Sequence, residues 1–309
     1  MLKLSIPKSN SICTLKNTGG YILIVTLLIT ALLISMVVEF VYSVYVSTSA
    51  LYNYRDAQNL SSMASSGIKV AISYLDNYLA SLEYSTIDNI ALPVTGLSDD
   101  GSGEVLVLTI QDECAKFNVN SIVFENGELN DERFASFVRL IEKLQLDKDV
   151  AYRIADWIDY DVEERILNGE KHAKNYFLFS LDELMMIDGI TVEFYKELRP
   201  FVTIYGAGLI NINTASPEVL YSLSANIDET LAVRLVEYRK EGHAFEKTYD
   251  ILNVAGFEDK GTSLMGKISV KSTAFAINST AKTDEIVKVV DAIIERSATG
   301  TDIKYWKEF

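Results

Sequence analysis

An uncharged apolar run near the start of the chain constrains its fold more than any other feature. The segment YILIVTLLITALLISMVV extends from Tyr21 to Val38, about the minimum length for a helix that crosses a bilayer core. Lys3, Lys8 and Lys16 precede it without any acidic residue, so the positive-inside rule predicts a cytoplasmic leader. The bulk of the chain then lies across the membrane, anchored by one spanning helix.

Helical character continues well beyond this run. No proline occurs between Tyr21 and Leu82, and Gly67 is the only glycine there. From Leu60 onward, apolar residues recur at spacings of three and four, which predicts one buried stripe on a helix. A helix of about 60 residues would be about 90 Å long. We expect its first half to lie in lipid or a filament core, and its second half to pack on a globular domain.

The small residues Gly19 and Gly20 stand directly before the apolar run, which begins at Tyr21. A secretory signal is cut at small residues after its apolar region, whereas cleavage here would keep the apolar stretch as the new N-terminus. A signal anchor that is never cut explains these residues equally well. The residues alone leave both alternatives open.

Charge and histidine content argue against two broad functions. The net charge is −15 at pH 7, and an acidic surface repels phosphate backbones, so nucleic acid is not expected as a partner. Only two histidines occur, His172 and His243. Neither stands in a local pattern with Ser, Cys or a carboxylate that would make it a base, so we expect no enzyme activity.

The rest of the chain alternates strand and helix signals. The region from Asn130 to Thr248 carries successive helix starts and stops, and Asn130, Ser216 and Asp228 are predicted to cap helices. The tail from Ser297 is expected to be loose. Strands are predicted at 104–111, 116–123 and 268–282, residues 285–296 suit a strand or a helix, and 87–103 reads as loop.

A weak internal repeat frames the helical region. Residues 117–121 (FNVNS) are similar to residues 210–214 (ININT). Each is a short strand that ends in an Asn-Ser or Asn-Thr pair suited to a turn or a helix cap. Two such strands would bracket an inserted helical module.

Several blocks of sequence carry a resemblance to a known family. They are Gly-Gly before YILIVTLL, then QDECAKFNVNSIV, ADWIDYD, ELMMIDGI and LRPFVTIYGAGLININTASPEVLYSL. The chain resembles type IV pilins and pseudopilins, and most specifically the K-type minor pseudopilins (GspK) of type II secretion systems. The resemblance covers nearly the whole chain. It implies an α+β fold, with a pilin-like long N-terminal helix packed on a small antiparallel sheet and a large inserted all-helical domain.

The resemblance also implies a division of the chain. The expected parts are a prepilin leader (1–20), the transmembrane part of the helix (21–46), a first pilin-like α/β part (47–124), an inserted helical domain with helix-hairpin-helix-like units (125–260) and a second pilin-like β part with the tail (261–309).

The family further implies processing by prepilin peptidase beside Gly19 or Gly20, with methylation of the new amine. Most pilins carry Glu at the fifth mature position, where it pairs with the amine of a neighbouring subunit. Here that position is Val25 after cleavage at Gly20, or Ile24 after cleavage at Gly19. K-type subunits lack this acid, which fits a place at the filament tip and disfavours a major pilin.

The expected function is therefore to cap the pseudopilus tip and prime its assembly. The implied partners are the I- and J-type minor pseudopilins, the major pseudopilin, prepilin peptidase and the inner-membrane assembly platform. The implied location is the bacterial inner membrane, with one span, a cytoplasmic N-terminus and a periplasmic globular part. The alternative is a minor pilin of a type IV pilus, used for adhesion, motility or DNA uptake.

A membrane-anchored DNA-binding protein is a further alternative. Residues 210–257 also resemble the helix-hairpin-helix module of competence DNA receptors. The Gly-rich turn that would hold a phosphate is replaced by SANIDE, so Asp228 and Glu229 stand where the phosphate would approach. A packing module is favoured over DNA binding.

Clustered acids indicate calcium as the only candidate cofactor. Asp156, Asp159 and Asp161 lie close together, and Asp99 and Asp100 border a Gly-Ser-Gly turn. Hard cations prefer carboxylate oxygens on flexible loops, although neither run follows EF-hand spacing. A solvated acidic surface is the competing interpretation. Known calcium binding in the helical module of K-type pseudopilins favours the first cluster.

Overall fold

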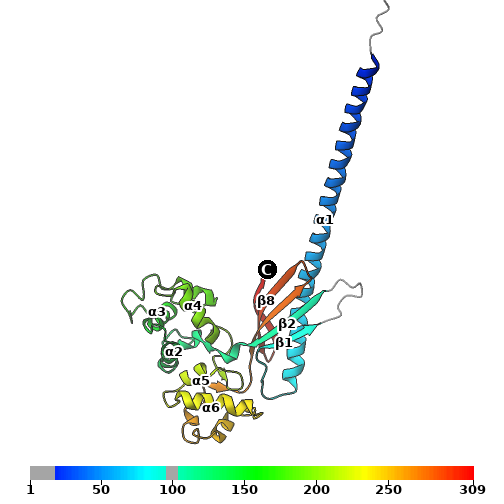
Figure 1. The fold of residues 1–309 in the computed structure, drawn as a ribbon. Coiled ribbons are helices and arrows are strands. Elements are labelled where there is room, and N and C mark those ends of the chain that lie inside the picture. The colour runs from blue at the N-terminus through cyan, green and yellow to red at the C-terminus, as the bar shows by residue number, and fades with distance from the viewer. Residues whose placement is uncertain (1–17, 95–103) are drawn as a thin grey trace, which may run out of the picture. The chain divides into compact units, whose positions relative to one another are not determined.

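A computed structural model of the protein describes residues 18–94 and 104–309. Its longest element is α1 (Thr18–Ala80), a single helix of 63 residues (Figure 1). The chain divides into two compact units, Met1–Asp56 and Ala57–Phe309, so α1 runs through both. The predicted long helix is confirmed, and its length follows from the absence of helix-breaking residues.

In the first unit, α1 is apolar on every side from Tyr21 to Val38, and mainly apolar from there to Val46 apart from Glu39. The large apolar side chains from Tyr21 to Val46 are mostly exposed, Leu28 at 64% and Phe40 at 69%. Their most apolar window has a mean hydropathy of 2.8, so the helix is long and apolar enough to cross a membrane. A helix that is apolar all round needs lipid or neighbouring helices to cover it.

In the second unit, the predicted stripe of α1 packs on an antiparallel sheet (Figure 1). Six stripe residues are buried: Leu60, Ala64, Ile68, Ala71, Leu75 and Leu79. The sheet has the order β1 (Ile90–Val94), β2 (Val105–Asp112), β7 (Ala274–Lys282), β8 (Val287–Ser297) and β9 (Gly300–Glu308). Alternate residues of β2, among them Leu106, Leu108 and Ile110, point into this core.

Between β2 and β7 the chain builds a helical lobe with its own apolar core. Its helices are α2 (Asp131–Lys143), α3 (Asp149–Ile158), α4 (Val192–Leu198), α5 (Pro217–Ser222) and α6 (Glu229–Lys240), with 3₁₀ turns at Glu113–Ala115, Val119–Ile122, Leu181–Met186, Arg199–Phe201, Thr248–Asn253 and Gly261–Leu264. The predicted caps Asn130, Ser216 and Asp228 each accept a hydrogen bond from a first-turn amide. The α+β fold class predicted from the sequence is confirmed.

The internal repeat corresponds to two equivalent strand pairs. Strand β3 (Phe117–Asn118) pairs in parallel with β4 (Val202–Thr203), and β5 (Ile210–Asn211) pairs in parallel with β6 (Ile268–Ser269). In each repeat, the first Asn side chain accepts from the backbone amide two residues on, Asn120 or Asn213. These Asx turns end the strands, so the predicted strand over 116–123 is wrong beyond Asn118.

Two further expectations are corrected at the edges of the sheet. Residues 90–94, expected as loop, form β1, and the tail expected to be loose forms β9. Both gain backbone hydrogen bonds from distant strands, β2 and β8, that no local pattern indicates. Residues 285–296, left open between strand and helix, lie mainly in β8, which begins at Val287.

A buried carboxylate, Asp112, joins the sheet to the helical lobe. Its Oδ2 accepts hydrogen bonds from Thr214 Oγ1 at 2.5 Å, Ser272 Oγ at 2.5 Å and Asn211 Nδ2 at 3.0 Å. Its Oδ1 accepts from the amide of Cys114 at 2.8 Å. Burial raises the pKa of Asp112 to about 6, although these four bonds oppose the rise.

We expect this carboxylate to impose a measurable pH dependence on stability. The folded protein holds the Asp112 proton more tightly than the unfolded chain, whose Asp pKa is near 3.8. The free energy of unfolding therefore falls as the pH rises from about 4 to 6, by about 3 kcal/mol from this group, and is level above that. Urea unfolding of wild type and Asp112→Asn at several pH values measures the difference. Equal pH slopes for both proteins would contradict the assignment.

Candidate functional site

The predicted processing residues lie at the start of α1. Gly19, Gly20 and Tyr21 are helical, and Tyr21 is 72% exposed. Val25, the residue at the position that usually carries Glu, is partly buried and apolar. The rest of the leader, before Thr18, lies outside the described residues.

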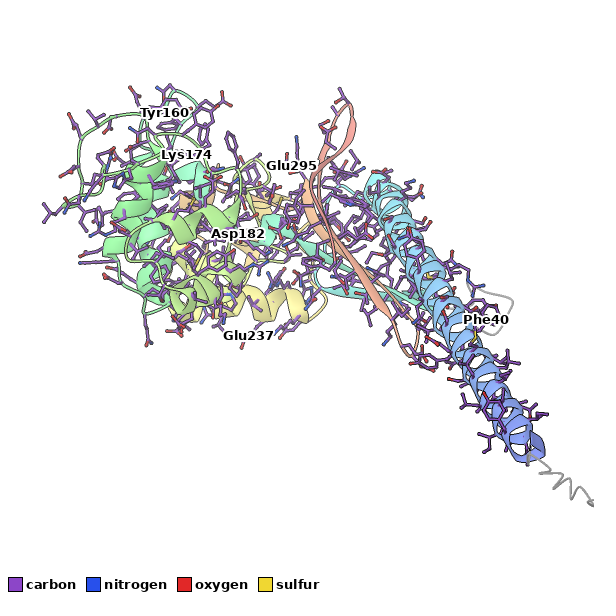
Figure 2. The ribbon with its side chains drawn as sticks, turned by 90° about the horizontal axis from the view of Figure 1, so that it is seen from above. Phe40, Tyr160, Lys174, Asp182, Glu237 and Glu295 are labelled. Atoms are coloured by element: carbon purple, nitrogen blue, oxygen red, sulfur yellow. The ribbon has the colours of Figure 1, made fainter. Side chains whose placement is uncertain are left out.

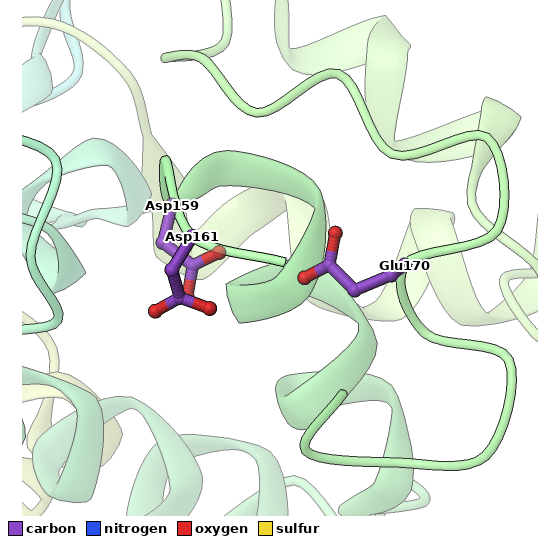
Figure 3. A group of neighbouring side chains, drawn as sticks. All are labelled: Asp159, Asp161 and Glu170. Carbon is purple, nitrogen blue, oxygen red and sulfur yellow. The ribbon is translucent and has the colours of Figure 1, made fainter. Parts of the chain in front are cut away.

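The second candidate site is an acidic cluster just after α3. Asp159, Asp161 and Glu170 can each place one carboxylate oxygen within 4.8 Å of the others. Figure 3 shows Asp159 and Asp161 on the segment that leaves α3, with the Glu170 carboxylate approaching from a separate loop. Two of the three predicted residues thus lie together, and Glu170 joins them from outside the predicted run. Asp99 and Asp100 lie outside the described residues.

Asp156, the third predicted residue, faces Arg165. Its oxygens accept from the Arg165 backbone amide at 3.1 and 3.2 Å and from Arg165 Nη1 at 3.1 Å. A Cβ at Gly169 would overlap the Asp156 carboxylate, so the loop approaches this closely only because residue 169 is glycine. Asp156 therefore holds the shape of the loop that carries Glu170.

Arg165 is the internal counter-ion of the cluster. Besides Asp156, its guanidinium contacts the Asp159 carboxylate and lies 3.2 Å from Asp161 Oδ2. One positive charge faces four carboxylates, counting Glu170, so the cluster keeps a negative excess. Burial raises the pKa of Asp159 to about 7, and the neighbouring carboxylates add to the rise while Arg165 opposes it. Burial also raises the pKa of Glu170.

Several buried oxygens in this loop lack a donor. Oδ1 of Asp159, Oε1 of Glu170 and Oδ1 of Asn175 accept no hydrogen bond from the residues that the structure describes, whereas Oδ2 of Asp159 contacts Arg165. These three atoms are hard oxygen ligands, and leaving them unpaired in the interior costs free energy. The donor set thus fits a hard divalent cation better than a hydrogen-bonded network. The spacing of acidic residues in the sequence did not indicate Glu170 or Asn175 as part of this cluster. Both lie near Asp159 only because of the path of the loop that follows it.

Residues 210–257, which resemble a helix-hairpin-helix module, contain α5 and α6. Asp228 caps α6, and its Oδ1 accepts from the amide of Leu231 at 2.9 Å. This carboxylate occupies the helix N-terminus where a phosphate would bind. Glu229, Glu258 and Asp259 lie in the same region, the last two lining a small hollow with Asp228. Arg234 and Lys260 line the same hollow, so its charge is mixed, and it is the capping carboxylate of Asp228 that disfavours a phosphate at this helix end.

The two histidines lie on the surface. His172 and His243 are both exposed, and His243 packs its ring 4.9 Å from that of Tyr238. Within residues 18–94 and 104–309, neither is hydrogen-bonded to a Ser, Cys or carboxylate side chain.

Removing the counter-ion of the acidic cluster tests this geometry. We expect Arg165→Met to lower the free energy of unfolding by about 3 kcal/mol, because buried Asp156 and Asp159 lose their cation. Lys171→Met, which removes an exposed cation from the same loop, serves as the matched control. Urea unfolding in EDTA measures both. Equal stability of the two variants would show that Arg165 does not neutralise the cluster.

Comparison with known protein families finds two matches, both within the helical lobe. Two family models, both described as type II secretion system (T2SS) protein K, match residues 115–207 and 210–271, together about half of the chain. Each match begins near the first strand of one repeat, β3 or β5, and ends shortly after its partner, β4 or β6. The two models thus correspond to the two repeats of the helical lobe.

A solved structure shares the fold. The crystal structure of the GspK-GspI-GspJ complex from the type 2 secretion system of enterotoxigenic Escherichia coli contains a chain with 19% identity and a TM-score of 0.64. The match covers 85% of this chain and 99% of that chain. A search of curated proteins found no match. With the two family matches over the helical lobe, the chain belongs to the type II secretion system protein K family, the GspK minor pseudopilins.

Proposed function

We propose that this protein caps the tip of a type II secretion pseudopilus and primes its assembly together with I- and J-type minor pseudopilins. The observation that carries the proposal is the family assignment over both repeats of the helical lobe. The similar chain of known structure belongs to a GspK-GspI-GspJ complex, which supports the choice of partners. The family is a structural component of secretion, so the proposed role involves no catalysis.

The N-terminal segment gives the tip placement a physical basis. Prepilin peptidase would cut beside Gly19 or Gly20, leaving a methylated amine at the head of α1. A subunit with Val25 instead of Glu offers no carboxylate to the amine of a subunit above it, and a buried amine without a partner is unfavourable. A first subunit needs no such partner. The major pseudopilin would then add below it, at the inner-membrane assembly platform.

The apolar half of α1 supports a single-pass anchor in the inner membrane. The exposed apolar surface of residues 21–46 suits lipid first and the filament core afterwards. The basic leader would stay in the cytoplasm, and the sheet and helical lobe would lie in the periplasm. A type IV pilus role is disfavoured because both family models describe type II secretion.

We predict that the protein forms a defined 1:1:1 complex with the co-encoded I- and J-type minor pseudopilins. Analytical ultracentrifugation of the full chains in detergent, alone and mixed, measures the species present. The complex should disappear when either partner is omitted. A folded protein that shows no association at micromolar concentration would contradict the tip-complex proposal.

A calcium ion in the acidic cluster is a second proposal, favoured by the donor-less oxygens of Asp159, Glu170 and Asn175. Asp159, Asp161, Glu170 and the Asn175 amide oxygen would hold the ion, and Asp156 would position the loop. Calcium would join the end of α3 to the 170–175 loop. Its contribution would be structural, since it would neutralise carboxylates that Arg165 alone leaves in excess.

We predict that calcium raises the melting temperature and that Glu170→Gln reduces this effect. Because Asp159 has a pKa of about 7, protonation competes with the cation, and calcium affinity should rise between pH 6 and 8. Terbium emission sensitised by the nearby Trp157 and Tyr160 reports binding directly. Glu164→Gln, at an exposed acid of the same loop, is the control. Terbium signals that are equal in both variants, or independent of pH, would contradict the site.

A further inference from the structure

A cluster of exposed aromatic side chains lies at one end of the helical lobe. Its members, called here the aromatic patch, are Phe124, Tyr160, Tyr176 and Phe179. They are 50%, 39%, 45% and 71% exposed. Figure 2 shows Tyr160 near the periphery of this lobe, with Lys174 beside it. Aromatic side chains of this size are normally buried, so a cluster left in solvent indicates an interaction surface.

The rings of the patch form one continuous surface. Tyr160 and Tyr176 stack at 5.6 Å between centroids with an interplanar angle of 9°, and Tyr176 lies 5.5 Å from Phe179. Phe177 packs edge-on against both tyrosines from the partly buried side. The stacked pair therefore presents a broad π surface rather than scattered single rings.

Backbone contacts hold the patch in place. The Tyr160 amide donates to the Gly127 carbonyl at 3.1 Å, and a Cβ at residue 127 would overlap the Tyr160 ring. Gly127 has φ +89°, a conformation that glycine adopts without strain, and its amide donates to the Phe124 carbonyl. Next to Tyr176, the backbone amide of Asn175 donates a hydrogen bond to the backbone carbonyl of Trp157 at 3.0 Å. The surface is thus pre-organised, which lowers the entropic cost of binding.

The border of the patch is acidic. Glu125 and Glu128 flank the Phe124 turn, and Asp161, Glu163 and Glu164 follow Tyr160, all exposed. Of the basic groups in the same loop, Arg165 and Lys174 are paired with carboxylates, Lys174 with Glu183 at 2.6 Å, and Lys171 is exposed. The exposed acids Glu125, Glu128, Asp161, Glu163 and Glu164 outnumber it. Carboxylates around an aromatic surface favour an approaching cation over an anion or a neutral group.

One ring of the patch, that of Phe179, already makes a cation–π contact within the protein. Lys174 Nζ lies 3.9 Å from the centroid of Phe179, a cation–π contact. Within the described part of the chain, no Lys or Arg lies over Tyr160 or Tyr176 in this way. The rings of Tyr160 and Tyr176 are therefore partly exposed, carry no cation from the described residues and lie inside an acidic border.

We infer that the aromatic patch is a docking surface for a basic segment of another protein, whose Arg or Lys side chains stack on Tyr160 and Tyr176 while their charges face the acidic border. The acidic border disfavours an anionic membrane surface, and it disfavours a second copy of this chain, whose net charge is −15. Docking of the segment requires neither the calcium ion nor the membrane anchor.

The test uses the full chain in a polyoxyethylene detergent, which avoids sugar head groups, and two labelled peptides. One peptide alternates Arg and Ala, and the other replaces each Arg by the neutral isostere citrulline. Fluorescence anisotropy gives the dissociation constants. We expect the Arg peptide to bind wild type, and to bind Tyr176→Ala about tenfold more weakly. Tyr249→Ala removes a tyrosine elsewhere in the lobe that is even more exposed, at 68%, and it should leave binding unchanged.

Any of the following results would contradict the inference. Equal binding to wild type and Tyr176→Ala would mean that bulk acidity alone attracts the peptide. Equal binding of the citrulline peptide, or displacement of the Arg peptide by a neutral oligosaccharide, would indicate a stacking surface for uncharged ligands such as glycans. Absence of binding up to millimolar peptide would also contradict it. Near-ultraviolet circular dichroism checks that Tyr176→Ala, a substitution at the surface, keeps the native fold.

Discussion

The Asp112 carboxylate lies where the chain passes between the sheet and the helical lobe, and the arrangement of both depends on it. Asp112 ends β2, where the chain leaves the sheet, and Ser272 precedes β7, where the chain returns. Asn211 and Thr214 belong to the start of the second repeat, between those two points. One buried acceptor therefore gathers three segments that are far apart in sequence. Since its donors would be left unpaired without it, the contact specifies a single packing of the lobe on the sheet.

A second carboxylate bridges the same junction. Glu113, the next residue, accepts from Thr203 Oγ1 at 2.5 Å and pairs with Lys116 at 2.5 Å. Thr203 lies in β4, the strand that closes the first repeat. Asp112 and Glu113 thus connect the end of β2 to both repeats of the lobe. This junction fixes the helical lobe to the sheet that packs on α1.

Both proposed contacts of the lobe, with calcium and with a partner, involve the same two segments, in which neighbouring side chains point to opposite sides. Asp159 faces inward with an unpaired Oδ1, and Tyr160, the next residue, faces outward in the aromatic patch. Asn175 and Tyr176 repeat this alternation on the returning loop. A cation that joins the inward residues would also fix the spacing of the outward pair. The loop could therefore serve calcium binding and partner docking without any additional element.

Sequence patterns predicted the parts of the structure that depend on local signals. The length of α1, its buried stripe and the caps Asn130, Ser216 and Asp228 each rest on neighbouring residues. Contacts between distant residues gave no such signal. Asp112 lies between two predicted strands and carried no signal of its own, and the tail that forms β9 was expected to be loose. Glu170 joins Asp159 through a loop whose path depends on Arg165 and Gly169. These features arise from tertiary pairing, which outweighs local propensity.

The position of the protein in the filament tests the proposed cap role most directly. Pseudopili can be assembled from the major pseudopilin with this chain and its minor partners, and then labelled with gold-conjugated antibody against the helical lobe. If the protein is the cap, gold particles should lie at one end of each filament and none along the shaft. Particles spaced along the length would show that the subunit is incorporated repeatedly, and would contradict a role as the cap.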